Sequence, residues 1–380
     1  MQDLVRQELA ATANLIVVKV GTRVLTRDDG ILDLDRIKSL AEQIHALRES
    51  GRQVVLISSG AVGAGMSQLG LTARPTELSK LQAVAAIGQT NLIEIYDSTF
   101  QTHGAHAAQV LLTAEDLSDR GRYLNVRNTL LTLLEMNAVP IVNENDTVAV
   151  EELMLTFGDN DRLAALVTNA IRAPLLIILS DVEGLYDGPP DRKESKVIPT
   201  VRKIDASIEA LIDDKSNPLS RGGMRSKLKA ARMATQAGES MIIASGRTPN
   251  VLPRLLAGEP LGTAFIAQGK AVSPLKRWIS YSAHSKGTLV IDQGACHAIV
   301  AKGRSLLPIG IVDVRGDFEK GDVVTLQDPT GLELGRGLTN YDSTQVNKIK
   351  GLPTDQIRDT LGQRSYAAVI HRDNMAITKQ

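Results

Sequence analysis

The stretch Leu15-Ile16-Val17-Val18-Lys19-Val20-Gly21-Thr22 decides the fold, because a continuous apolar run ends there in a lysine and a glycine. A strand that is covered on both faces of a sheet has such a run, so we expect a buried strand over Asn14–Val20. Similar runs occur at Val54–Ser58, Ala107–Leu112, Val139–Val142, Pro174–Ser180 and Met241–Ala244. Helical patterns lie between them, at Asp35–Ser50, Leu78–Phe100, Tyr123–Glu135, Arg162–Ile171, Asp205–Ile212, Met224–Ala237 and Val251–Ala257. Strands that alternate with helices predict an α/β fold, a three-layer αβα sandwich around a mostly parallel open sheet.

The pattern changes after Gly262, where short glycine-containing strands follow one another without a long helix between them. We expect these strands at Gly287–Ile291, Ala298–Val300, Gly310–Arg315, Asp322–Leu326 and Glu333–Gly337. The chain is therefore predicted to have an α/β domain at 1–270, a linker at 271–284, and a small β-rich domain with a C-terminal tail at 285–380.

Composition excludes several classes of protein. The 380 residues hold 43 Lys and Arg against 43 Asp and Glu, so no net charge attracts nucleic acid or an anionic membrane. Aromatic residues make up only 3% of the chain, which argues against a base-stacking surface. Cys296 is the only cysteine, so no intramolecular disulfide can form. No apolar stretch reaches the ~20 residues that span a bilayer, and the N-terminus lacks a signal-peptide pattern. We expect a soluble, cytoplasmic protein.

Two short polar segments are dense in acids and amides. Asn143–Asp146 directly follows an apolar strand run, and Gly158–Asp161 directly precedes the helix-like run Leu163–Val167. Strand ends and helix starts in such sheets face ligands rather than the core. Together the segments carry four carboxylates and three amides. Repulsion among so many carboxylates is unfavourable unless a metal ion, an ammonium group or a lysine neutralises their charge.

Cationic and anion-binding features accompany these segments. Lys19 ends a buried strand, although a lysine there could also reach solvent with its head group. The turns Ser58–Gly65 and Gly222–Lys227 each open a helix, and free backbone N–H groups at a helix start suit an anion, although small residues also serve tight packing. Ser180–Asp181 ends another strand, where Asp could bind a ribose or simply cap a turn. The combination, without a nucleophile–histidine pair, favours phosphoryl transfer by positioning and electrostatics.

Five of these motifs resemble those of the glutamate 5-kinase family within the amino acid kinase superfamily. They are Val17–Thr22, Ser58–Ala61, Asn143–Asp146, Gly158–Asp161 and Gly222–Lys227. The C-terminal region is similar to a PUA domain at Ser305–Gly310 and Val369–Asp373, so the resemblance spans nearly the whole chain. The chain departs from the family pattern at Ser220-Arg221, where Gly-Thr is common, and at Arg225-Ser226, which precedes the lysine in place of Ser-Thr.

The resemblance implies phosphorylation of the γ-carboxylate of L-glutamate by ATP with Mg²⁺, the first step of proline biosynthesis. It implies that Lys19 and Lys227 stabilise the transferring phosphoryl group and that Asp161 orients both lysines. Glutamate would be bound by Ser59, Asp146 and Asn160, with Asn143 and Asp159 close by. The ATP site would be lined by Lys19, Gly21, Ser180, Asp181, Arg221, Gly222, Gly223, Met224, Arg225, Ser226 and Lys227. No residue is assigned directly to the metal. The resemblance further implies a homo-oligomer, proline as a feedback inhibitor, and a glutamyl-phosphate reductase that receives the product.

Three alternatives remain at this point. One is a kinase for another small carboxylate or a carbamate on the same fold. A second is RNA binding through the PUA-like domain, against which the zero net charge and the few aromatic residues weigh. A third is a catalytically inactive regulator, against which the presence of Lys19, Asp161 and Lys227 weighs.

Overall fold

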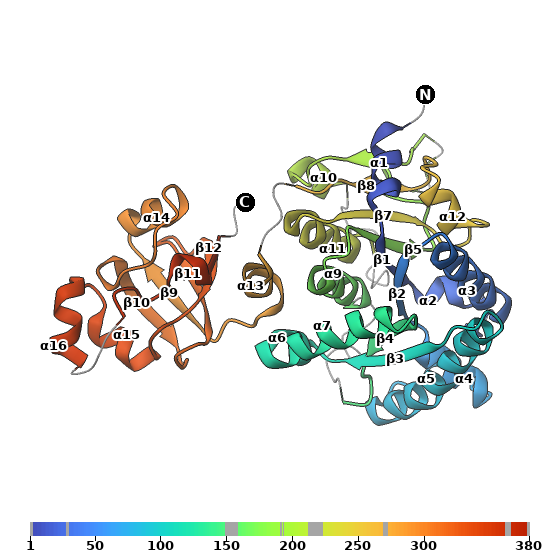
Figure 1. Ribbon diagram of the computed structural model, residues 1–380, viewed down its shortest axis with the longest axis horizontal. Coiled ribbons are helices and arrows are strands. Elements are labelled where there is room, and N and C mark those ends of the chain that lie inside the picture. The colour runs from blue at the N-terminus through green and yellow to red at the C-terminus, as the bar shows by residue number, and fades with distance from the viewer. Residues whose placement is uncertain are drawn as a thin grey trace. The chain divides into compact units, whose positions relative to one another are not determined.

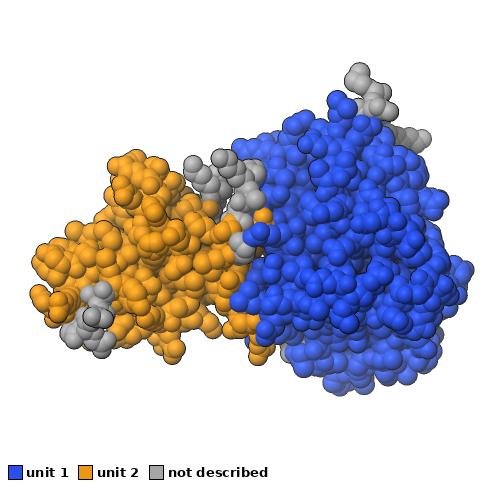
Figure 2. Space-filling view, in the orientation of Figure 1, with its two compact units in different colours: residues 1–116, 123–271 blue, residues 117–122, 272–380 orange. Residues whose placement is uncertain are grey.

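The structure of the chain is a computed structural model, which describes residues 3–27, 30–148, 159–190, 192, 194–211, 223–268, 273–361 and 366–377. It divides into two compact units (Figures 1 and 2). Unit 1 comprises Met1–Asp116 and Tyr123–Ala271, and unit 2 comprises Leu117–Arg122 and Val272–Gln380.

The described part of unit 1 is built on one eight-stranded sheet, with the order β3-β4-β2-β1-β5-β7-β8-β6. The strands are β1 (Leu15–Val20), β2 (Gln53–Ser58), β3 (Ala107–Leu112), β4 (Val139–Glu144), β5 (Leu175–Ser180), β6 (Thr200–Val201), β7 (Ser240–Ser245) and β8 (Thr263–Phe265). The strands from β3 to β7 in this order are parallel, and β8 runs antiparallel to β7. Every residue of β1 and β5 is buried, which confirms the predicted mostly parallel sheet with both faces covered.

Helices cover both faces of this sheet (Figure 1). The helices described up to Leu256 are α1 (Leu4–Thr12), α2 (Thr22–Leu25), α3 (Leu34–Glu49), α4 (Ala61–Gln68), α5 (Leu78–Gln101), α6 (Ala114–Ser118), α7 (Arg120–Glu135), α9 (Asp159–Ile171), α10 (Ala206–Ala210), α11 (Met224–Ala237) and α12 (Val251–Leu256). On β1, Ile16, Val18 and Val20 pack with the apolar faces of α3, α5 and α12 in one core. Side chains alternate along a strand, so Lys19 belongs to the other face, where α9 packs against β1 and α11.

The start of α9 differs from the prediction and matters for the site. Apolar periodicity begins at Leu163, so the sequence predicts a helix from Arg162, yet the helix begins at Asp159. Asp159, Asn160 and Asp161 therefore form its first turn instead of preceding it. Acidic side chains are favourable in the first turn because the helix N-terminus is electropositive. The residues before Asp159 back to Ala149 lie outside the described residues.

The described part of unit 2 is built on a small five-stranded sheet with the order β10-β9-β11-β12-β13. Its elements are α13 (Pro274–Arg277), a π-helical turn (Trp278–Ser282), β9 (Gly287–Ile291), α14 (Gln293–Val300), β10 (Ile311–Gly316), β11 (Val323–Gln327), β12 (Glu333–Leu338), α15 (Ser343–Ile349), α16 (Ile357–Leu361) and β13 (Met375–Ile377). The two PUA-like motifs of the sequence lie side by side, because Leu306 and Ile370 form a β-bridge. Among the described residues no helix has the length and apolar character needed to cross a membrane.

The predicted strand Ala298–Val300 is wrong, because these residues end helix α14. The β-branched pair Ile299-Val300 favours a strand by propensity. The helix is set instead by its N-cap, since the Asp292 carboxylate accepts a hydrogen bond from the backbone N–H of Ala295 at 2.7 Å. Burial of Ile299 in the core of unit 2 then fixes the helix against the sheet.

Candidate active site

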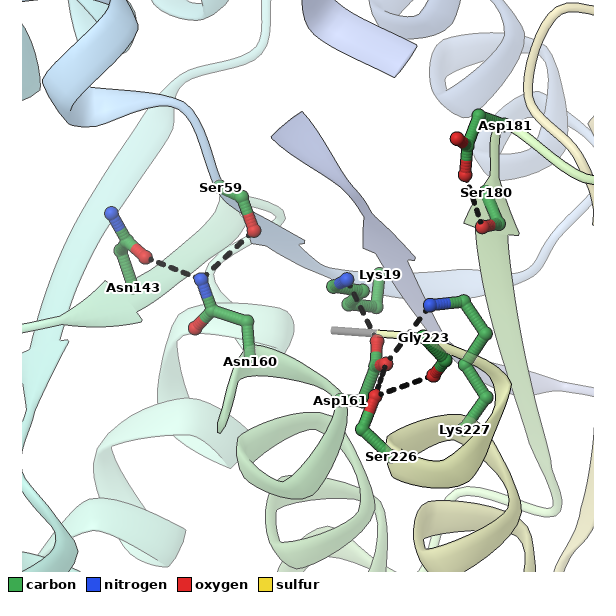
Figure 3. Close-up of polar contacts among 10 residues, drawn as sticks. All are labelled: Lys19, Ser59, Asn143, Asn160, Asp161, Ser180, Asp181, Gly223, Ser226 and Lys227. Carbon is green, nitrogen blue, oxygen red and sulfur yellow. Dashed lines mark hydrogen bonds and ion pairs between the residues drawn. The ribbon is translucent and has the colours of Figure 1, made fainter. Parts of the chain in front are cut away.

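Two lysines share one buried carboxylate at the carboxyl edge of the sheet, the edge where the parallel strands end (Figure 3). Lys19 Nζ lies 2.7 Å from Asp161 Oδ1, and Lys227 Nζ lies 3.2 Å from Asp161 Oδ2. Ser226 Oγ donates a third hydrogen bond to Oδ2 at 2.7 Å. The side chains of both lysines are 8% exposed and that of Asp161 is 1% exposed. Three charges therefore lie together almost out of contact with water.

The charges of this cluster stabilise one another. Burial opposes ionisation of Asp161, but the charges of Lys19 and Lys227 with hydrogen bonds from Lys19 and Ser226 outweigh it and hold its pKa below the ordinary value. For Lys227, burial and the neighbouring Lys19 charge lower the pKa below that of an ordinary lysine, against the opposing effect of Asp161. The cluster as a whole carries one net positive charge, so it attracts an anion.

Three elements from distant parts of the sequence assemble this cluster. Lys19 comes from the end of β1, Asp161 from the first turn of α9, and Ser226 and Lys227 from the first turn of α11. The residues meet because α9 and α11 pack together on the face of the sheet to which Lys19 belongs. Apolar packing of the helices thus fixes groups whose mutual contacts no local sequence pattern specifies.

A chain of amides and a hydroxyl lies beside the charged cluster (Figure 3). Asn160, next to Asp161 on α9, donates from Nδ2 to Ser59 Oγ at 2.9 Å and to Asn143 Oδ1 at 3.1 Å. Asn143 in turn donates from Nδ2 to Gln89 Oε1 at 2.8 Å. The structure therefore joins Ser59, Asn143 and Asn160, three residues that the sequence places up to 101 positions apart.

Other predicted residues lie at the same edge. Gly21 follows β1, and its N–H donates to Leu179 O at 3.1 Å. Ser180 ends β5 and donates from Oγ to Asp181 Oδ1 at 3.1 Å, while Arg23 lies 3.0 Å from Asp181 Oδ2. The charge of Asp181 also acts on Lys227, which links this pair electrostatically to the lysine cluster.

Gly223 is the N-cap of α11 and has no side chain to cap the helix, so the first turn presents its backbone N–H groups. Ser226 and Lys227 from this turn reach the carboxylate of the cluster, whereas the side chain of Arg225 is exposed. The predicted residues Arg221 and Gly222 lie outside the described residues, as does the side chain of Asp159.

Asp146 lies two residues beyond β4 and has a different electrostatic environment. Burial raises the pKa of its carboxyl to about 6, although the charge of Arg74 acts in the opposite direction. Arg74 is itself buried enough that its pKa is lowered, an effect that Asp146 opposes. A carboxylate that is costly to ionise without a partner is suited to a cationic ligand.

Comparison with known proteins identifies the family. Residues 14–245 match the amino acid kinase family and residues 287–361 the PUA domain. The chain is 50% identical to a glutamate 5-kinase of Rhodopirellula baltica over 98% of this chain and 96% of the relative. The chain belongs to the glutamate 5-kinase family. It is also 46% identical to glutamate 5-kinases of Pseudomonas putida and Caldanaerobacter subterraneus, over 95% and 96% of this chain and 97% and 98% of theirs. A solved structure similar to the chain is carbamate kinase from Giardia lamblia bound to AMP-PNP, with a TM-score of 0.49 and 20% identity over 68% of this chain and 100% of that one.

One member of the amide chain, Gln89, is absent from the residues predicted from the sequence. It lies on the buried face of α5 with Ala85, Leu92 and Tyr96, and successive members of this set are three or four residues apart. A glutamine on an otherwise apolar helix face is the signal that could have revealed it, because a buried amide needs hydrogen-bond partners.

Proposed function

We propose that the protein transfers the γ-phosphoryl group of ATP to the γ-carboxylate of L-glutamate, producing L-glutamyl 5-phosphate and ADP. One observation carries the proposal: two lysine ammonium groups, both nearly buried, converge on the single carboxylate of Asp161 at the carboxyl edge of the sheet. Ligands of open parallel sheets bind at that edge. Membership of the glutamate 5-kinase family supports the choice of glutamate over another carboxylate or a carbamate.

The reaction needs charge neutralisation rather than a base. A γ-carboxylate has an ordinary pKa of ~4.3 and is ionised at neutral pH, so no proton has to be removed before it attacks phosphorus. An oxygen of the carboxylate forms the new P–O bond, and the bond between the γ-phosphorus and the bridging oxygen of ADP breaks. The obstacle is repulsion between two anions, and Lys19 and Lys227 offset it where water is scarce. Asp161 holds both ammonium groups in place.

ATP and Mg²⁺ belong to this proposal. The N-terminus of α11 at Gly223 suits the phosphates, and Gly21, Ser180 and Asp181 lie at the same edge for the rest of the nucleotide. The described residues hold no group of three or more His, Cys, Asp and Glu side chains arranged to bind a metal. Mg²⁺ commonly binds through the phosphates of a nucleotide, and we propose that it binds here through those of ATP. When bound, the ion neutralises charge on the phosphates.

The direct test is to trap the acyl phosphate. Purified protein with ATP, Mg²⁺, glutamate and hydroxylamine is expected to form the hydroxamate of glutamate and to release an equal amount of ADP. Aspartate, N-acetylglutamate and carbamate in place of glutamate serve as controls for substrate choice, and each is expected to yield less than a tenth of the product. Faster turnover of one of these compounds than of glutamate would contradict the proposal.

Asp146 is proposed to bind the α-ammonium group of glutamate, and its pKa predicts how binding depends on pH. A carboxylate attracts an ammonium group only when ionised, and the pKa is about 6. We therefore expect kcat/KM for glutamate to be constant above this value and to fall as the pH drops through it, by about tenfold for each pH unit below. Glutamate's own carboxylate titrates near ~4.3 and does not produce this limb.

The variant Asp146→Ala is expected to raise the KM for glutamate by more than tenfold, to leave the KM for ATP within about threefold, and to remove the limb near pH 6. The measurement is kcat/KM from pH 5 to 8 for both enzymes. A raised KM for ATP with an unchanged KM for glutamate would place Asp146 on the nucleotide side instead.

The pathway, the inhibitor and the oligomeric state of the protein are proposed from its membership of the glutamate 5-kinase family. The product would pass to a glutamyl-phosphate reductase in proline biosynthesis in the cytoplasm. Proline as a feedback inhibitor and a homo-oligomeric state are tested by adding proline to the hydroxamate assay and by light scattering of the purified protein.

A further inference from the structure

Gln89 is held rigidly beside the proposed glutamate site. It lies on α5 and is 7% exposed. Next to it, α5 and α4 approach so closely that a Cβ atom on Gly88 would lie 1.9 Å from Ala61 O and one on Gly65 1.9 Å from Val84 O. Only glycine fits at these two contacts. The backbone that carries Gln89 is therefore fixed against α4, the helix that begins just after Ser59.

Gln89 lies at one end of the amide chain, and it contacts the chain through its acceptor oxygen rather than its NH₂ group. Its Oε1 accepts from Asn143 Nδ2, so Asn143 turns Oδ1 toward Asn160 and receives the Nδ2 group of that residue. An amide has a donor end and an acceptor end, so the orientation of each member fixes that of the next. If Gln89 presented its NH₂ group instead, both asparagines would have to reverse.

The observed polarity leaves one acceptor unused. Asn160 Oδ1 is buried and has no hydrogen-bond partner among the described residues, although Nδ2 of the same side chain has two acceptors. A buried carbonyl oxygen without a partner costs stability unless a ligand supplies a donor. In the reversed polarity Asn160 would present NH₂ to the ligand, and a donor repels an ammonium group.

We propose that Gln89 is a positioning residue for substrate selection: its acceptor oxygen orients Asn143 and Asn160 so that Asn160 Oδ1 accepts a hydrogen bond from the α-ammonium group of the amino-acid substrate. The inference rests on the proposed function and adds a residue to it. Gln89 Nε2 is also buried without a partner in the described part of the chain, so Gln89→Glu keeps the acceptor and loses no hydrogen bond.

The test compares Gln89→Met, which removes the acceptor at similar volume, with Gln89→Glu, which can only accept when ionised. Gln101→Met is the matched control, because Gln101 is exposed at the end of the same helix and its side chain bonds only Asp97 among the described residues. Hydroxamate kinetics give kcat and the KM for glutamate and ATP. Glutarate, which lacks the ammonium group, is added as a competitor, and thermal melting checks folding.

For Gln89→Met we expect the KM for glutamate to rise about tenfold, because a buried amide loses its orienting partner. The kcat of Gln89→Met, its KM for ATP and its inhibition constant for glutarate are expected to stay within about threefold of the wild-type values. For Gln89→Glu and Gln101→Met, these three quantities and the KM for glutamate are all expected to stay within that range. If Gln89 had only a structural role, its replacement would weaken the binding of glutarate and of glutamate to the same extent.

Three outcomes would overturn the proposal: an unchanged KM for glutamate in Gln89→Met, an equal rise in Gln89→Glu, or a parallel loss of glutarate binding. If Gln89→Met does not fold, Gln89→Asn takes its place, because an amide that is one methylene shorter stays polar but cannot reach Asn143 Nδ2. A tenfold rise in the KM for glutamate with unchanged glutarate inhibition then supports the proposal, and an unchanged KM contradicts it. Wild-type protein that forms no hydroxamate contradicts the proposed function, before any variant is compared.

Discussion

Replacing Lys227 with methionine is expected to lower kcat by at least about 10³-fold while the protein stays folded. Lys227 is one of two cations that offset the repulsion between the attacking carboxylate and the transferring phosphoryl group. Because that charge is needed most in the transition state, the loss should appear in kcat more than in the KM for either substrate.

Stability is expected to change little in this variant, because Asp161 is not left alone. Its carboxylate remains 2.7 Å from Lys19 Nζ and accepts from Ser226 Oγ at 2.7 Å. Methionine fills most of the space of the lysine stem, so the packing between α9 and α11 is retained. The cluster becomes neutral, and it therefore loses its attraction for an anion.

The matched control for Lys227→Met is Lys229→Met, since Lys229 lies two residues further along α11 and is exposed. It is expected to keep kcat within about twofold of the wild type, as surface substitutions generally do. Hydroxamate assays at saturating ATP and glutamate measure kcat for both variants, and thermal melting checks that they are folded. Activity above one per cent of the wild type in a folded Lys227→Met protein would exclude Lys227 from phosphoryl transfer.

The sequence predicts the central sheet well because its signal is local. Each buried parallel strand is a continuous apolar run, and each neighbouring helix has its own periodicity, so β1 and α11 were placed within a residue of their bounds. The same pattern predicts which polar residues lie at the carboxyl ends of the strands. Short elements are harder to predict. The strand predicted at Ala298–Val300 is wrong because β propensity favours a strand there, whereas the Asp292 N-cap begins a helix that includes these residues.

The contacts within the site depend on tertiary packing and could not be predicted from local pattern alone. Family resemblance implied that Asp161 orients both lysines, and the structure brings the three together. Gln89 on an apolar helix face indicates a buried amide that needs a partner, but no local pattern identifies that partner, because Asn143 lies 54 residues away. The contact depends on the packing of α5, which glycine contacts fix against α4.

Replacing Asp161 with asparagine is expected to have the largest effect on stability. The side chains of Lys19 and Lys227 are each 8% exposed, and Asp161 is the carboxylate that both contact. An asparagine can accept a hydrogen bond from one lysine, but its NH₂ group would face the other as a second donor. Breaking a buried ion pair by removing one partner costs about 3–5 kcal/mol, so we expect a loss of that size in the free energy of unfolding. Turnover should also fall by more than about 10²-fold, because neither ammonium group is held in position.

The control for stability is Asp181→Asn, at the same edge of the sheet. Its ionic partner Arg23 has a 71% exposed side chain, and exposed pairs contribute about 0–1 kcal/mol. Chemical denaturation of the wild type and both variants measures the difference, and equal losses in the two would contradict a special role for Asp161.

The pH dependence of the Asp161→Asn effect follows from the lowered pKa of Asp161. A carboxyl whose pKa is lower in the folded state contributes stability that is complete above its unfolded-state pKa of ~3.9 and is lost as the pH falls through the folded-state value. The difference in unfolding free energy between the wild type and Asp161→Asn should therefore be constant from neutral pH down to about pH 5 and shrink only in stronger acid. Asp146 titrates near pH 6 in both proteins, so its contribution cancels in this difference. A difference that shrank already near pH 6 would therefore contradict the ionised carboxylate of Asp161 as its source.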